Sequence, residues 1–422
     1  MLRAFVNAFK IPDLRKKILF TLFIIAVFRF GSHLPAPDIN VKALENEFNA
    51  PNNQSVLQFI DLFSGGALTR FAVFSLGIMP YITSSIIMQL LTVVIPRLEQ
   101  WQRQGEIGIK KITQYTRYMT VTLALLQSTG LVFLFNSQFQ VVRIFDPEHV
   151  GIIVLTLTAG TAMIMWLGEL ITQRGIGNGM SILIFTSVIS RLPSEGLAIL
   201  RQAGQAKFYF FLALGVAIIF AVVFMEQGQR RIPVQYAKRI VGRRQTQGGS
   251  TYIPLKVNQS GVIPIIFASS ILYFPTLLVS VIHATWFKNF VDNYVLNTAS
   301  PVYMIIYGLL VVFFAYFYTA IQFDPYRTAD DIRKYGGFIP GIRPGNPTGQ
   351  YLANVLNRIT LPGSLWLAAI ALLPSVFLSI WNIQAFPFGG TSILITVGVA
   401  LETMKQIESQ LMMRNYEGFL SS

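Results

Sequence analysis

Ten apolar runs separated by polar segments constrain the fold of this chain more than any other feature. A transmembrane helix needs about 20 predominantly apolar residues, and the fifth run is shorter, but the Gly-rich turn at 175–179 before it can return the chain directly into the bilayer. Charged residues make up only 12% of the chain, about half the share in a soluble domain. The sequence therefore predicts an all-α polytopic membrane protein with ten transmembrane helices, near residues 18–34, 71–95, 118–135, 150–171, 180–192, 208–225, 261–283, 302–323, 361–381 and 386–404.

Lys and Arg are distributed unequally between the segments that join these runs. The segments on the side of the N-terminus hold 25 of them and the opposite segments hold 7. Cytoplasmic loops carry the excess of positive charge in membrane proteins, so both termini are expected in the cytoplasm. Residues 1–17 are basic and 18–34 are apolar, but no convincing signal cleavage site follows. We interpret 18–34 as a retained first transmembrane helix.

Ten spans divide into two sets of five, the arrangement of an inverted repeat. We expect an N-terminal half at 1–192 with spans 1–5, and a C-terminal half at 193–422 with spans 6–10. No convincing residue-level similarity links the halves, so the repeat is inferred from the span count.

The stretch 59–96 consists of two elements of unequal length. A helix over Phe59 to Leu68 would be about 15 Å long, too short to cross a hydrocarbon core of about 30 Å. Gly65 and Gly66 interrupt the helix before the run at 71–95. Non-helical backbone at membrane depth requires protein or a water-filled cavity around it, so the pattern indicates an enclosed cavity. The alternative is an interfacial re-entrant turn that only packs.

Two cytoplasmic segments are too long to be simple turns. Residues 226–260 alternate in period two at Ile232, Val234 and Tyr236, which predicts a basic hairpin that bends at 242–244. Residues 324–360 predict a helix over 325–335 and then a rigid Pro/Gly turn at 339–345 that carries Arg343. Ordinary positive-inside bias would explain the charges in these segments, but not the ordered turn around Arg343.

The sequence offers little for an enzyme or an ion-coupled transporter. Asp, Glu and His are almost absent from the span centres, where coupled transporters carry them. No catalytic or phosphate-binding motif occurs, and the chain has no cysteine. We therefore expect no catalytic residues, no metal site and no cofactor. Uncharged polar residues in the second, third and seventh spans act either as interhelical packing contacts or as a seam that opens.

Nine ordered motifs resemble the bacterial SecY protein-conducting channel family over nearly the whole chain. They are LFSGG (62–66), LGIMPYI (76–82), QYTRY (114–118), GIGNG (175–179), QGQRRI (227–232, with Gln227 in place of Arg), YAKR (236–239), LKVN with GVIP (255–264), PGIRPG (340–345) and FGGTS (388–392). Two positions depart from the family pattern. Asp38 stands where the family often has Gly, and Gln104-Gly105-Glu106 replaces a more acidic triplet.

The resemblance implies the central channel subunit of a Sec translocase, which conducts unfolded preproteins across the membrane and releases hydrophobic segments into lipid. It implies a short re-entrant plug helix at 59–68, including Ile60, Asp61, Leu62, Phe63, Ser64, Gly65 and Gly66. It implies a pore ring of Ile78, Ile82, Ile184, Ile266 and Ile395. It implies a lateral gate between spans 2–3 and 7–8, with Ser85, Ile86, Gln127, Ser128 and Asn258. It implies partner-binding arginines at Arg243, Arg244 and Arg343.

The same resemblance implies the partners and the membrane. The partners are SecE and SecG, the SecA motor ATPase, the ribosome with its rRNA and proteins, signal-sequence-bearing preproteins and membrane lipid. The expected location is the bacterial plasma (inner) membrane. Two other functions remain open on the residues alone: a secondary transporter of a small solute, and a non-conducting scaffold for membrane assembly.

Overall fold

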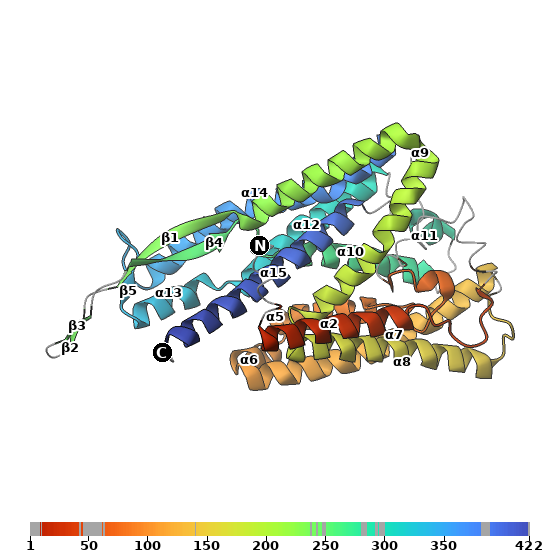
Figure 1. Ribbon diagram of the computed structural model, residues 1–422, viewed down its shortest axis with the longest axis horizontal. Coiled ribbons are helices and arrows are strands. Elements are labelled where there is room, and N and C mark those ends of the chain that lie inside the picture. Colours follow the sequence, from red (N-terminus) through yellow and green to blue (C-terminus); the bar gives the residue numbers. More distant parts are fainter. Residues whose placement is uncertain are drawn as a thin grey trace.

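The computed structural model describes residues 9, 11–41, 44, 61, 64–139, 141–236, 239–241, 244–246, 250–279, 285–291, 294, 300–380 and 389–420. Helices dominate this part of the chain, and each predicted span overlaps a helix (Figure 1). The helices are α2 (Pro12–Gly31), α5 (Met79–Val94), α6 (Pro96–Arg103), α7 (Glu106–Phe139), α8 (Pro147–Arg174), α9 (Gly179–Gln227), α10 (Ile263–Val279), α11 (Thr285–Phe290), α12 (Pro301–Gln322), α13 (Pro325–Lys334), α14 (Asn346–Ile380) and α15 (Gly389–Leu420).

Length and hydropathy identify candidate spans within the described chain. Five segments pass both criteria, and the bent pair α5 and α6, at 100°, gives a sixth. The fifth and seventh predicted spans correspond to shorter apolar helices at Gly179–Ser194 and Ile263–Leu272. The five segments are Glu106–Asn136, Pro147–Arg174, Gly204–Gln227, Pro301–Lys334 and Asn346–Phe377. The chain is an all-α polytopic membrane protein, as the sequence predicts.

Helix α9 contains both the fifth and the sixth predicted spans. Its backbone leaves the helical region at Gly204, where φ is 80° and ψ is 172°. Glycine adopts a positive φ without steric cost because it has no Cβ. Pro193 also lies inside this helix. The chain therefore bends here between two apolar segments, which Figure 1 shows as the corner of α9.

The second span begins later than the sequence predicts. The expected helix begins at Phe71, but residues 71–78 form turns and α5 begins at Met79. Phe71 and Gly77 have positive φ angles of 45° and 56°, which cannot continue a right-handed helix. Pro80 stands in the first turn of α5, a position that tolerates its missing N–H. A run of apolar residues thus marks membrane depth but not the start of the helix.

The backbone conformation of Asp38 accounts for the departure from the family pattern at this position. Its φ is 59°, in the left-handed region that Gly occupies most easily. Asp is one of the few other residues that enter this region without large strain. The backbone turn that a glycine would allow is therefore retained here with a side chain.

The predicted tight turn between α8 and α9 is confirmed. Gly177 has a φ of 83°, and the Asn178 side chain accepts hydrogen bonds from the N–H groups of Met180 and Ser181. Gly179 donates its N–H to Thr172 Oγ1 at 2.9 Å. A Cβ at Gly179 would overlap the carbonyl oxygen of Gly168. The two helices can approach this closely only with glycine at position 179.

Gly179→Ala is therefore expected to lower the thermal unfolding midpoint of the purified protein. Overpacking of a tight contact costs about 1–3 kcal/mol. Gly151→Ala in α8 is the matched control, because a Cβ there meets no heavy atom within 4 Å. Equal midpoints for the two variants would contradict the close approach of α8 and α9.

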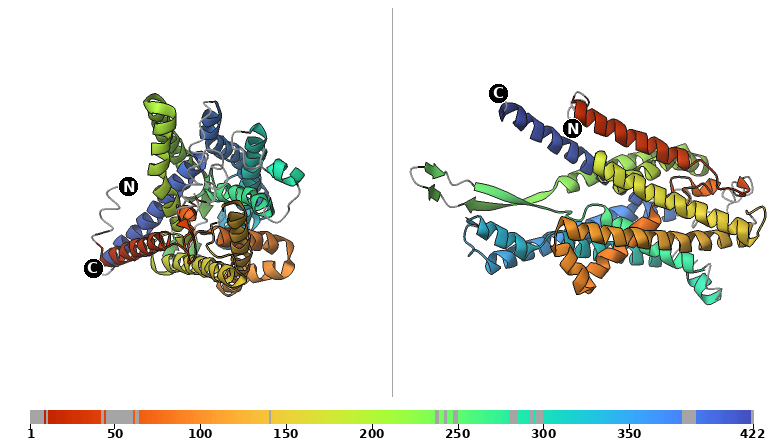
Figure 2. Two further views of the ribbon diagram at one scale, coloured as in Figure 1. Left: turned by 90° about the vertical axis from the view of Figure 1, so that its right-hand side faces the viewer. Right: turned by 90° about the horizontal axis from the view of Figure 1, so that it is seen from below.

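The predicted hairpin is also confirmed. Strands β1 (Gln229–Tyr236) and β4 (Ser250–Lys256) pair antiparallel, with Ile232 opposite Ile253. Ile232 and Val234 are buried on one face and pack with α13 and α14. Period-two alternation produces this arrangement because successive side chains point to opposite faces. The hairpin and α13 project from one end of the molecule, where α15 also ends (Figures 1 and 2).

Two short pairings were not predicted from the sequence. Strand β5 (Gly337–Phe338) adds to the free edge of β1 and gives the sheet order β4-β1-β5. Strands β2 (Arg239–Val241) and β3 (Arg244–Thr246) form a separate two-stranded pair. The segment at 324–360 is mostly helical, with α13 at 325–334 and the first turns of α14 from 346.

The helices pack around a large apolar core drawn from both halves of the chain. In the first half, α7 packs against α8 and α5, and α2 packs against α8. In the second half, α12 packs against α10 and α14, and α15 packs against α14 and the long α9. Helix α10 crosses between the two groups and contacts α5 and α7. The resemblance predicts the lateral gate at this contact of α10 with α5 and α7.

Candidate functional site

A cavity of about 720 Å³ lies between α5, α7, α8, α9 and α10. Its walls include Ile109, Lys110 and Gln114 from the start of α7, and Glu169 and Gln173 from the end of α8. These positions lie on the side predicted to face the cytoplasm. Both chain halves contribute, because Ile263 and Ile266 of α10 face the same space. The cavity therefore lies where α10 meets α5 and α7.

Three of the five predicted ring residues line this cavity: Ile82, Ile184 and Ile266. They come from α5, α9 and α10, which are far apart in the sequence. Ile78 and Ile395 are buried in the same apolar core but do not line the cavity. Branched aliphatic side chains without polar atoms thus form part of the wall of a partly polar cavity.

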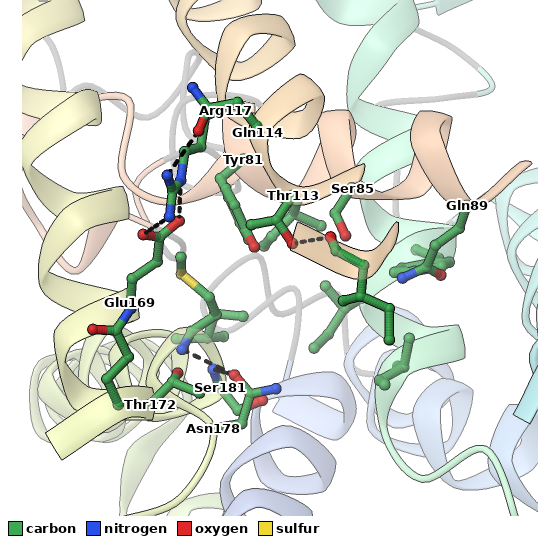
Figure 3. Close-up of a pocket in the computed structure, with 18 of the residues that line it drawn as sticks. Tyr81, Ser85, Gln89, Thr113, Gln114, Arg117, Glu169, Thr172, Asn178 and Ser181 are labelled. Atoms are coloured by element: carbon green, nitrogen blue, oxygen red, sulfur yellow. Dashed lines mark hydrogen bonds and ion pairs between the residues drawn. The ribbon is translucent and has the colours of Figure 1, made fainter. Parts of the chain in front are cut away.

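The cavity wall contains an ion pair between Arg117 and Glu169 that was not predicted from the sequence. Arg117 Nε donates to Glu169 Oε1 at 2.8 Å, and Arg117 Nη2 donates to Glu169 Oε2 at 2.7 Å (Figure 3). Arg117 Nη1 also donates to Gln114 Oε1. A bidentate guanidinium–carboxylate pair fixes geometry as well as charge. It joins α7 to α8 within the first half, and the QYTRY motif was the signal that could have located it.

The predicted plug segment contacts α9 at Ser187, Ser190 and Arg191, which follow Ile184 along the helix. Ile184, Ser187 and Arg191 share one face of this helix, because residues three and four apart are neighbours on a helix surface. Ile184 lines the cavity, whereas a Cβ at Gly65 would lie 3.0 Å from Ser187 Cα. Along α9, the cavity-lining residues up to Ile184 are therefore followed by the residues that contact the predicted plug segment.

The predicted short helix of the plug is described in part. Asp61 and Ser64 have helical backbone, Gly65 and Gly66 have positive φ, and the 3₁₀ helix η1 (Leu68–Arg70) follows. The glycine interruption is therefore confirmed. Ile60, Leu62 and Phe63 lie outside the described residues.

The predicted gate residues occupy three different settings. Ser85 lines the cavity, and Ile86 is buried in the core beside it on α5. Ser128 is buried and lies 3.2 Å from Thr158 Oγ1, so it joins α7 to α8. Gln127 is buried. Asn258 donates to Glu226 Oε1 at 2.6 Å and to the Gly261 carbonyl, so its hydrogen bonds stay within the second half.

The predicted partner-binding arginines differ in how far they are described. Arg343 is exposed on the turn before α14, and its carbonyl accepts a hydrogen bond from Thr348 Oγ1 at 2.8 Å. Ile339, four residues earlier, is buried against the hairpin. Arg244 begins β3, and Arg243 lies outside the described residues.

Comparison with known proteins places this arrangement in a family. The protein-family model described as SecY matches residues 72–404. The chain is 55% identical to the protein translocase subunit SecY of Streptomyces coelicolor and 51% identical to that of Mycobacterium bovis, over the full length of both chains in each case.

Solved structures share the fold at low sequence identity. A structure described as a protein conducting channel has a TM-score of 0.63 at 17% identity, with 96% of each chain covered. Sec61 in a canine ribosome-channel complex from the endoplasmic reticulum has a TM-score of 0.59 at 16% identity, again with 96% of each chain covered. The match over 72–404 and the full-length relatives show that this chain belongs to the SecY family.

Proposed function

We propose that this chain is the central channel subunit of a protein translocase and conducts unfolded polypeptides across the membrane. The observation that carries the proposal is the order along α9 of a partly polar cavity, the apolar residue Ile184 and a glycine-interrupted plug segment. The names of the full-length relatives support it.

The chemistry of the ring suits a cargo of every sequence. A conduit for arbitrary polypeptides cannot present fixed charged ligands, because these would retain oppositely charged segments. Branched aliphatic side chains such as Ile82, Ile184 and Ile266 can move aside to admit the varied side chains of a translocating polypeptide. A narrow apolar constriction also excludes ions by dewetting. We infer that Ile78 and Ile395 complete the constriction from the surrounding core.

A lateral gate is proposed at the contact of α10 with α5 and α7. These helices belong to the proposed halves 1–192 and 193–422, which we infer separate about the bend of α9. Ser85, Ile86, Gln127, Ser128 and Asn258 are proposed to line or support this seam. Small and polar residues let membrane helices pack closely and hydrogen-bond across their contact. We infer that separation of the two halves at this seam exposes a route to lipid.

The proposed partners follow from the cytoplasmic surface and from the relatives. The SecA motor ATPase and the ribosome are proposed to dock on the end that carries the hairpin and Arg343. A channel–ribosome complex is named for the similar Sec61 structure, and SecE and SecG are proposed as membrane partners. The proposed location is the bacterial plasma membrane with both termini in the cytoplasm, in line with the charge bias.

The test is translocation of a preprotein by the purified chain with SecE and SecG in proteoliposomes. Protease-protected preprotein is expected only when SecA and ATP are both present. A secondary transporter would instead show uptake of a small solute without SecA. A scaffold would show neither translocation nor added conductance after deletion of 60–68. Either result would contradict the channel proposal.

A further inference from the structure

Asp61 of the plug is completely buried and carries a dense set of interactions. Its Oδ2 lies 2.7 Å from Nη1 of Arg191 on α9. Its Oδ1 accepts hydrogen bonds from the N–H groups of Leu68 and Thr69 and from Ser64 Oγ, at 3.0–3.2 Å. One carboxylate therefore closes the turn of the plug segment on itself and also ties it to α9.

A second arginine holds the same segment from another helix. Arg29 near the end of α2 donates through Nη1 to the Gly65 carbonyl at 2.8 Å and to Ser190 Oγ at 3.0 Å. Gly65 is the residue at which the plug helix stops, and Ser190 precedes Arg191 on α9. The carbonyl freed by the helix end thus receives a charged donor. Arg29 and Arg191 therefore bind two positions of one short segment, the Gly65 carbonyl and the Asp61 carboxylate.

Both arginines lie in the first half of the chain. The proposed ring draws Ile266 and Ile395 from the second half. Within the described part of the chain, the polar contacts of Asp61 and Gly65 go to α2, to the early part of α9 or to the plug segment itself. Separation of the halves along the α10 seam therefore leaves these contacts intact.

We propose that Arg29 and Arg191 form a latch that fixes the plug to the first half, so that gate opening and plug release are separate steps. This inference rests on the proposed channel function. Removal of one partner from a buried ion pair leaves an uncompensated buried charge, which is strongly unfavourable. The latch therefore holds the plug in place until a translocating chain displaces it. The guanidinium groups of Arg191 and Arg29 left behind then attract the Asp61 carboxylate and the Gly65 carbonyl back to their sites.

The experiment uses the channel complex in vesicles without motor or preprotein. Because the chain has no cysteine, a single Ala67→Cys reports the plug position. Ala67 is completely buried and small, and it lies outside the latch contacts. The rate at which a membrane-impermeant maleimide labels Cys at position 67 measures how often the plug leaves its seat.

In the Ala67→Cys background, Asp61→Asn and Arg191→Gln are each expected to raise the labelling rate at least about tenfold. Asp61→Asn keeps the shape of the side chain and an oxygen for the Leu68 and Thr69 N–H groups. The double variant is expected to label no faster than the faster single variant, because both changes remove the same interaction. Arg201→Gln, an exposed position on the same helix, is the control and is expected to leave the rate unchanged.

An unchanged labelling rate in Asp61→Asn would overturn the latch. A double variant whose increase in labelling rate equals the product of the two single increases would overturn it as well. Translocation by the parent complex separates this proposal from the channel proposal. If the parent does not translocate, the channel function fails whatever the labelling shows. If it translocates and labelling does not respond to Asp61→Asn, only the latch fails.

Discussion

Arg343→Glu is expected to abolish motor-driven translocation while the protein still inserts with normal topology. Topology depends on many cations summed over short loops, and one of the 25 on that side changes the sum little. Arg343 instead is exposed on a turn whose conformation is held by its glycines and by a hydrogen bond to a buried residue. Gly341 and Gly345 supply positive φ angles of 82° and 101°, and the Ile342 N–H donates to the carbonyl of buried Ile339.

The stiff turn matters because a guanidinium can make two parallel charge-assisted hydrogen bonds to a carboxylate or phosphate. An ammonium cannot reproduce that geometry. Loss of such a contact in a buried interface costs about 2–5 kcal/mol, which weakens association more than tenfold. Arg343→Lys is therefore expected to retain part of the activity, and Arg343→Glu none.

The measurement is SecA-stimulated translocation together with SecA binding for these variants. Arg358→Glu is the matched control, because Arg358 is exposed on the following helix α14 and the change in net charge is the same. Normal binding and activity are expected for the control. Equal defects at Arg343 and Arg358 would mean that bulk charge matters and that Arg343 makes no specific contact.

Ile82→Asn or Ile395→Asn is expected to raise resting ion conductance at least about tenfold and to let defective signal sequences pass. Both side chains are buried in the apolar core. An amide without full hydrogen bonding in such a setting costs about 1–3 kcal/mol, and hydration of the constriction relieves this cost. The closed state loses stability relative to the open state for that reason.

Single-channel recording and translocation of a preprotein with a mutated signal test this expectation. Ile109→Asn is the control, because Ile109 lines the same cavity but is largely exposed at the start of α7. The control is expected to keep the parent conductance and discrimination. Ring variants that discriminate signals as stringently as the parent would show that these isoleucines do not form the constriction.

Much of the fold follows from the sequence because hydropathy and turn residues report on local structure. Each apolar run predicted a helix that is present, and the alternation at Ile232 and Val234 predicted the buried face of a real hairpin. The start of the second span was predicted incorrectly at Phe71. Apolar character is shared by the turns at 71–78 and by α5, and the positive φ at Phe71 is set by tertiary packing, which hydropathy does not report.

The polar contacts of the site could not be predicted in the same way. Arg117 and Glu169 are 52 positions apart, and Asp61 and Arg191 are 130 apart, so their pairing depends on how whole helices are placed. The sequence located the glycine interruption at Gly65 but gave no sign of the arginines that hold it. The resemblance assigns Asn258 to the gate, whereas its hydrogen bonds to Glu226 and Gly261 remain within the second half. Its role in the gate stays a prediction.

The central claim is that a polypeptide passes through the ring inside this chain, and site-specific photo-crosslinking tests it most directly. A photoreactive residue is placed at Ile82, at Ile395 or at Phe224, an outward-facing residue of α9 that is 81% exposed. A preprotein is then arrested during SecA-driven translocation and the complex is irradiated. We predict adducts between the preprotein and positions 82 and 395, dependent on ATP, and none at position 224. Adducts at 224 with none at the two ring positions would contradict passage through the ring.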